Sequence, residues 1–229
     1  MRKLTDEVRE ELRRTHGGEL RVIEVEGHEG LALVVKAPDR KAWAAAFDGL
    51  GKPAGRIDAL HNLLVDCVVW PEAAALPAAL DEVPALPELV WPVLAGLAGA
   101  PEDELQAIPL SKLGAEERAE LAAAGLTEGR LAELMATTRG ASQHVALRVG
   151  TALWLLKCPS SSHYAASRRL SLQGKVFEGL YRLALNAIEW PTSEAVATVF
   201  ERAPGLASAV GEVVMELCGS EAKLRVGGI

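Results

Sequence analysis

The chain has 229 residues, of which 49% are hydrophobic and 4% aromatic, and its formal net charge is −7. This hydrophobic content is enough for one large or two small packed cores, so the composition excludes a disordered tail or linker. The acidic balance argues against nucleic acid as the main partner, because binding to phosphates requires clustered Lys and Arg side chains.

The sequence also argues against a membrane protein and a disulfide-stabilised one. No apolar run reaches about 18 residues, and the first residues lead directly into a charged helix without the apolar core of a signal peptide. We therefore expect no membrane partner and a cytoplasmic protein. Cys67, Cys158 and Cys218 lie far apart and form no C-x-x-C pair, which favours reduced thiols over disulfides or a metal site.

The first predicted elements are a short helix and a β-hairpin. Thr5 is a candidate N-cap, and Gly17 follows the helix as a candidate C-cap. Residues 20–26 and 31–37 are rich in β-branched and aliphatic side chains and flank a Gly-containing turn. This segment is expected to be a helix followed by two paired strands.

Helices are predicted for the rest of the first hundred residues. Asp39 can cap a helix that carries Trp43, and apolar residues at helical spacing between 57 and 67 predict an amphipathic helix. The Trp70-Pro71 pair is expected to end that helix, because the residue before a proline is disfavoured in the α region. Two further helices are separated by a break at Pro84. Residues 1–100 are thus predicted to form an αββαααα module.

Residues 101–125 are predicted to be a helical linker. Pro101 and Pro109 interrupt it, and the charged, Ala-rich residues 115–124 should form a helix that ends at Gly125. A second αββαααα module is predicted over residues 126–229. Its expected features are Thr127 and Ser160 as N-caps, Gly140 as a C-cap, and a hairpin formed by residues 144–149 and 151–158.

A series of landmark residues recurs in the same order in both halves. The landmarks are Lys36, Pro38, Trp70, Pro71 and Pro84, followed by Lys157, Pro159, Trp190, Pro191 and Pro204. Lys and the first Pro recur 121 residues later, and the other three recur 120 residues later. The predicted fold is therefore α+β and mostly helical, a tandem duplication of a module with a β-hairpin and about five helices. Two such modules suggest an intramolecular pseudo-dimer.

The search for chemistry yields no catalytic, cofactor-binding or metal-binding residues. The strongest candidate is Ser160 to His163, but the first copy has Asp39-Arg40-Lys41-Ala42 there, and helix capping explains a Ser at this position. No two histidines have the i, i+4 spacing of a helical zinc pair, and the Gly-Lys pairs lack the other residues of a P-loop. We therefore predict a protein that is not an enzyme and uses no cofactor.

The order of these motifs resembles small phage tail assembly chaperones. The residues that carry the resemblance are 34–38, Trp43, 63–71, 84–86 and 94–99, and more weakly 155–159, 189–191 and 204–206. The resemblance implies a non-enzymatic protein that engages tail proteins during assembly in the host cytoplasm. Because this chain has two modules, a permanent structural role in the virion is an alternative. Expected partners are other phage tail or virion proteins, with a homo-oligomer as a further option.

Two readings of other classes stay open at this point. The chain could be an enzyme or small-ligand binder that uses a cleft between the two modules, near His163, Tyr164 and the Trp-Pro segments, since clefts between domains are common binding sites. It could also be a bacterial adaptor that binds a partner helix in an apolar groove.

Overall fold

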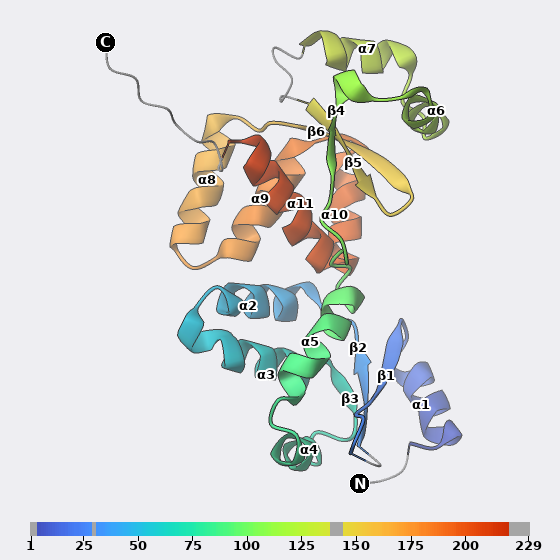
Figure 1. Cartoon of the computed structure of the whole chain (residues 1–229), viewed down its shortest axis with the longest axis vertical. Helices are drawn as coiled ribbons and strands as arrows, with labels where there is room; N and C mark the ends of the chain where they lie inside the picture. Colours follow the sequence, from blue (N-terminus) through green and yellow to red (C-terminus); the bar gives the residue numbers. More distant parts are fainter. Residues whose placement is uncertain (1–3, 29–30, 138–143, 220–229) are drawn as a thin grey trace. The chain divides into compact units, whose positions relative to one another are not determined.

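The computed structural model describes residues 4–28, 31–137 and 144–219. Within these ranges the chain forms eleven α-helices and seven β-strands, and about 60% of it is helical. The chain divides into two compact units (Figure 1): unit 1 comprises residues 1–100 and 201–206, and unit 2 comprises residues 101–200 and 207–229. The predicted mixed α+β, mostly helical class is confirmed.

Unit 1 opens with a helix and a hairpin, as predicted. Its elements are, in chain order, α1 (Asp6–His16), β1 (Leu20–Glu24), β2 (Ala32–Lys36), α2 (Arg40–Leu50), the 3₁₀ turn η1 (Pro53–Gly55), α3 (Arg56–Cys67), β3 (Val68–Trp70), α4 (Leu76–Glu82) and α5 (Leu86–Leu97).

Unit 2 begins with an additional segment and then repeats the element order of unit 1. Its elements are β4 (Ala107–Pro109), the 3₁₀ turn η2 (Leu110–Lys112), α6 (Ala115–Ala123), α7 (Glu128–Thr137), β5 (His144–Val149), β6 (Ala152–Lys157), α8 (Ser161–Leu172), α9 (Val176–Ala187), β7 (Ile188–Trp190), α10 (Ser193–Arg202) and α11 (Pro204–Leu217).

The predicted helix caps are present in both units. Each of the four side chains accepts a hydrogen bond from the backbone N–H three residues further on, which satisfies a donor that the first helical turn leaves free. The pairs are Thr5–Val8, Asp39–Ala42, Thr127–Arg130 and Ser160–His163. Gly17 follows α1 with φ +57°, whereas Gly140 lies outside the described residues.

The αββαααα prediction was wrong in one respect, because each unit has a third strand. Helices α3 and α9 do not run to the Trp-Pro pairs; they end at Cys67 and Ala187. The next three residues form β3 and β7, which pair antiparallel with β2 and β6. A three-residue apolar strand has the same sequence pattern as a last helical turn, so only its pairing with a distant strand distinguishes the two. The peptide bonds Trp70–Pro71 and Trp190–Pro191 are both cis.

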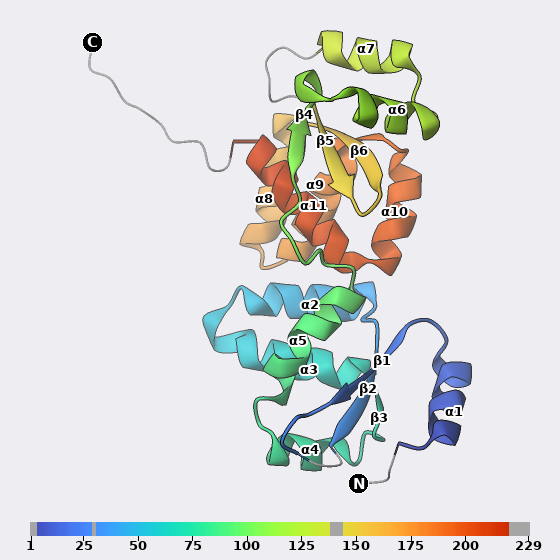
Figure 2. The same ribbon diagram turned by 45° about the vertical axis from the view of Figure 1, so that its right-hand side comes forward.

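The sheet of unit 1 separates two layers of helix. Leu33 and Val35 lie on its inner face and pack against the buried side chains of α2, α3, α4 and α5. Residues directly opposite on antiparallel strands point to the same face, so Val22, Val34 and Trp70 share the other, outer face. Helix α1 covers that face (Figure 2).

The same strand register occurs in unit 2. Val34 opposes Trp70 in unit 1, and Leu155 opposes Trp190 in unit 2, with a register shift after Val34 and after Leu155. In the neighbouring pair, Leu20 opposes Lys36 and His144 opposes Lys157. These pairings define which positions of the two units correspond. Leu155 and Trp190 therefore mark the outer face of the unit 2 sheet.

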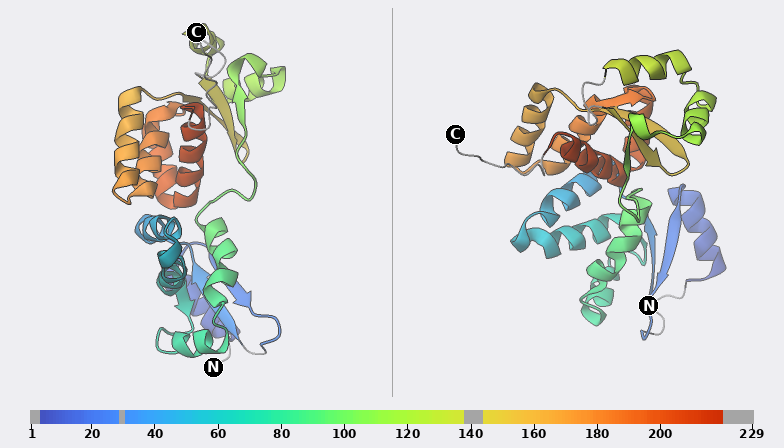
Figure 3. Two further views of the ribbon diagram at one scale, coloured as in Figure 1. Left: turned by 60° about the vertical axis from the view of Figure 1, so that its left-hand side comes forward. Right: turned by 45° about the horizontal axis from the view of Figure 1, so that its top comes forward.

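Residues 101–125 are part of unit 2 and not a separate linker between the units. Helix α6 lies where the sequence predicts a helix, but β4 pairs with β5 and makes the sheet four-stranded, in the order β4-β5-β6-β7. Figure 3 shows α6 and α7 on one side of this sheet and α8, α9 and α11 on the other. Among the described residues, no helix has both the length and the apolar character needed to span a membrane.

Candidate protein-binding groove

The landmark residues mark the boundaries of elements. Lys36 and Lys157 are the last residues of β2 and β6, and Pro38 and Pro159 directly precede the N-caps of the following helices. Pro84 lies between α4 and α5, and Pro204 begins α11. Trp70 and Pro71 also line a cavity on the outer face of unit 1.

Helix α1 is amphipathic, yet none of its residues is fully buried. It is strongly polar on one side, while Val8 and Leu12 on the other side are half-buried. In the corresponding helix α7, Leu131 and Leu134 are only 6% and 5% exposed. Helix α1 therefore presents apolar side chains that the rest of unit 1 covers incompletely.

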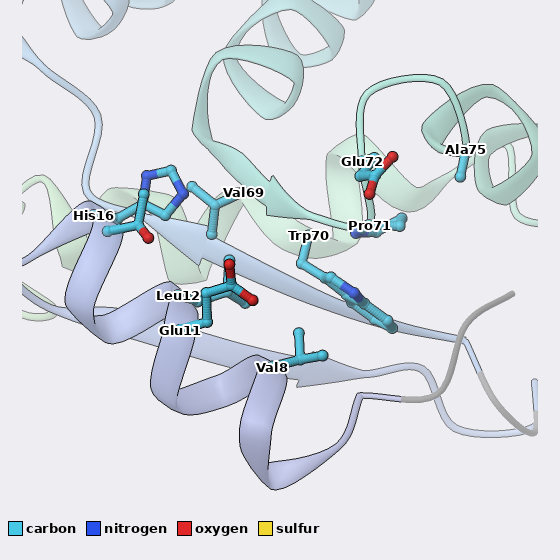
Figure 4. A pocket seen from close by; sticks show the side chains of 10 residues that line it. Val8, Glu11, Leu12, His16, Val69, Trp70, Pro71, Glu72 and Ala75 are labelled. Carbon is cyan, nitrogen blue, oxygen red and sulfur yellow. The ribbon is translucent and has the colours of Figure 1, made fainter.

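A cavity of about 520 Å³ separates α1 from β3 and the turn that follows it. We call this cavity the α1 groove. Val8 and Leu12 of α1 project toward Val69 and Trp70, which form the apolar part of its lining (Figure 4). The remaining lining residues are Glu11, Thr15, His16, Pro71, Glu72 and Ala75. An apolar centre with a polar rim is typical of a surface that binds another polypeptide.

A second cavity of about 400 Å³ lies against the same Trp70 ring, between the start of α1 and the hairpin. Its lining includes Leu4, His28 and Ala32, and its charged members are Arg9, Glu24 and Glu26. The Nε atom of Arg9 is buried and has no hydrogen-bond partner among the described residues. The outer face of unit 1 is thus underpacked on both sides of Trp70.

The outer face of unit 2 is closed by the segment that precedes α7. The leucines of this segment and of α7 pack with Ala146, Leu153 and Leu155 of the sheet, and Ile108, Met135 and Trp190 pack against them. Gly125 lies against the Trp190 ring, since a Cβ atom there would be 3.7 Å from a ring carbon. Six leucines of this cover are 6% exposed or less: Leu110, Leu113, Leu121, Leu126, Leu131 and Leu134.

Charged residues in unit 2 occupy two positions that are apolar in the α1 groove. Glu189 forms an ion pair with Lys157 and lies 3.7 Å from Arg130, and its side chain is only 15% exposed. The corresponding residues of unit 1 are Val69 for Glu189 and Val8 for Arg130. Burial lowers the pKa of the nearby His144, an effect that Lys157 and Arg130 reinforce and Glu189 opposes. The corresponding residue of unit 1 is Leu20.

The strongest catalytic candidate of the sequence, Ser160 to His163, forms the capped start of a helix. Ser160 Oγ accepts a hydrogen bond from the backbone N–H of His163, as expected of an N-cap, and it also lies 2.9 Å from Ser162 Oγ.

Burial raises the pKa of the Cys67 thiol to about 12, so the reactive thiolate is scarce at neutral pH. No group of three or more His, Cys, Asp or Glu side chains in the described part of the chain could hold a metal ion.

Comparisons with protein-family models, curated proteins and solved structures found no match to this chain. The α1 groove is therefore interpreted from its own geometry. The sequence analysis did not identify Val8, Leu12 and Val69 as site residues. A usable sign was nevertheless present, because aligning the two halves sets Val8 against Arg130 and Val69 against Glu189. A pair that is apolar in one half and oppositely charged in the other marks a local difference in surface chemistry.

Proposed function

We propose that this chain is a non-enzymatic assembly protein that acts through protein-protein contacts, as small phage tail assembly chaperones do. It acts in the host cytoplasm on tail or virion proteins, and a permanent place in the virion is the alternative form of the same role. We further propose that units 1 and 2 are duplicated copies of one module. The shared element order, the matching β2–β3 and β6–β7 registers and the four equivalent caps support the duplication.

The observation that carries the proposal is the different state of one surface in the two units. The outer face of unit 2 is filled by leucines from residues 107–126, whereas the same face of unit 1 retains the α1 groove. The lining of the groove is apolar around Val8, Leu12 and Trp70, which suits contact with apolar side chains of another protein. What the two units share is packing and capping residues, which favours assembly over catalysis.

The test is affinity purification of the tagged chain from cells that produce phage tail components, combined with mass spectrometry of purified particles. We expect a tail or virion protein to co-purify in a fixed ratio, and a Leu12→Asp variant to lose it. Glu88→Arg, a change on the exposed side of α5, is the control variant and should retain the partner. Absence of the chain from particles would assign a chaperone role, and a fixed copy number would assign a structural one.

Two results would contradict the proposal. One is the absence of any enriched tail or virion protein relative to the tag alone. The other is normal tail assembly after deletion of the gene from the phage that encodes it.

A further inference from the structure

In unit 2, a segment of the same chain closes the outer face of the sheet. Strand β4 pairs with the free edge of β5, so that Ala107, Ile108 and Pro109 lie opposite Leu147, Ala146 and Val145. The chain then crosses the outer face through η2 and α6. Leu110 and Leu121 on this path are 2% and 1% exposed. One short strand and one helix, together with α7, therefore fill the face.

Unit 1 has the same free strand edge, and none of its described residues covers it. Strand β1 is the outer strand of the order β1-β2-β3. Its residues Arg21, Val22 and Ile23 correspond to Val145, Ala146 and Leu147, because their partners on β2 and β6 correspond. Val22 is 41% exposed, whereas Ala146 is completely buried under the cover. Glu24 of β1 lines the second cavity, and Trp70 lines both this cavity and the α1 groove. An unpaired strand edge is a template for an added strand.

The charges on this edge indicate what the added segment carries. In unit 2, Arg148 of β5 forms an ion pair with Glu120 of α6 at 3.1 Å. The corresponding residue of β1 is Glu24, so the sign of the charge is reversed. The lining of the two cavities also contains Glu11, Glu26 and Glu72. A helix docked here would therefore meet carboxylates where α6 meets an arginine.

We propose that the β1 edge and the α1 groove together bind a strand-helix segment of a partner protein, one that resembles residues 107–126 in its leucines but is basic where they are acidic. The segment adds a strand to β1 and lays an apolar helix face on Val22 and Trp70. This inference rests on the proposed assembly function and specifies the chemistry of the partner. It adds a fourth strand to unit 1, as β4 does to unit 2.

The same observations disfavour a second copy of this chain as the occupant. Residues 107–126 of a second copy have their leucines buried in their own unit 2. Their Glu120 would also lie opposite Glu24, and like charges in contact weaken binding. Binding of a segment of opposite charge avoids both costs.

The experiment uses the full chain and two synthetic peptides as probes. One peptide has the sequence of residues 105–127, and the other is the same peptide with Glu120→Lys. Fluorescence anisotropy measures affinity, and hydrogen exchange locates the bound peptide. We expect the Glu120→Lys peptide to bind about fivefold or more tightly than the unmodified one, with protection of the β1 amides. A Leu121→Asp change in the peptide should abolish binding.

A variant of the chain with a reversed charge at residue 24 distinguishes peptide binding at this site from nonspecific binding. The Glu24→Arg variant should reverse the preference and bind the unmodified peptide more tightly, because it restores the charges of the Arg148–Glu120 pair. Glu88→Arg makes the same change in charge outside the groove and should leave both affinities unchanged. Circular dichroism checks that each variant is folded.

Three outcomes would overturn the inference: no binding of either peptide, equal affinities that Glu24→Arg does not change, or protection confined to unit 2. Concentration-dependent dimerisation that Glu24→Arg strengthens would instead assign the surface to a second copy and also overturn it. Each of these results leaves the assembly function open, because the particle experiment tests that function without the peptides.

Discussion

The outer faces of the two sheets are covered to different extents. In unit 2 the face is closed by residues 107–126 and by α7, and the six leucines of this cover are buried. Among the described residues of unit 1, only α1 covers it, and cavities of about 520 and 400 Å³ remain. The comparison shows that a strand-helix segment of the same chain covers this face in unit 2, and that the described residues of unit 1 include no such segment.

The side chains at corresponding positions differ along with the cover. Arg130 and Glu189 are close enough to form an ion pair in unit 2, whereas the corresponding Val8 and Val69 both line the α1 groove. Apolar side chains such as these gain free energy when a partner removes them from water. A comparison of matched substitutions in the two units tests this difference directly.

The largest expected difference comes from one leucine that occurs at corresponding positions. Leu134→Ala in α7 should lower the free energy of unfolding of unit 2 by about 2–5 kcal/mol, because it leaves a cavity in a closed cluster. Leu12→Ala in α1 should cost unit 1 under about 1 kcal/mol, because this side chain already borders open space. Urea unfolding followed by hydrogen exchange, resolved for each unit, measures both. Equal losses of unfolding free energy in the two variants would contradict the difference between the two outer faces.

The next effect concerns the ion pairs of Glu189. Glu189→Val gives unit 2 the residue of unit 1 and should cost about 1–2 kcal/mol, because Lys157 loses a partly buried partner. Glu133→Ala is the control. Its side chain is 68% exposed and also pairs with Arg130, so its removal should cost under about 0.5 kcal/mol. The urea midpoints of the two variants report the difference, and a smaller loss for Glu189→Val would contradict the assigned role.

The smallest effect is a pH dependence confined to unit 2. Because burial lowers the pKa of His144 below its ordinary value of 6.5, the unfolded chain takes up this proton first as the pH falls. The contribution of neutral His144 is therefore complete above about pH 6.5 and decreases below it. His144→Leu, which introduces the unit 1 residue, should flatten the decline in unit 2 stability between pH 7.5 and 5. If the decline in stability is unchanged in this variant, titratable groups other than His144 cause it.

The sequence predicted the elements whose formation depends on nearby residues. The caps Thr5, Asp39, Thr127 and Ser160 each bind an N–H three residues away, so their effect is visible in a four-residue window. The hairpins were predicted for a similar reason, since alternating side chains and a glycine turn lie within one short segment. The apolar helix faces follow from a periodicity that repeats over one or two turns.

The candidate site could not be predicted in the same way. Its Trp70-Pro71 wall was recognised as a landmark, but Val8, Leu12 and Val69 are unremarkable apolar residues in sequence. What distinguishes them is that the described residues of unit 1 provide no covering leucines, which is a property of packing. The charge difference between Glu24 and Arg148 acquires meaning only when the strand registers place both at the same sheet edge.

By itself the sequence determined the mixed, mostly helical composition, the helix starts, the paired strands of each hairpin and the order of the landmarks. Tertiary structure alone decided that residues 68–70 and 188–190 are strands, that residues 107–109 join the sheet of unit 2, and that α1 lies over a groove. The physical reason is the range of the interactions. Caps and helix periodicity act within a few residues, whereas a three-residue strand or an uncovered face is defined by groups far away in the chain.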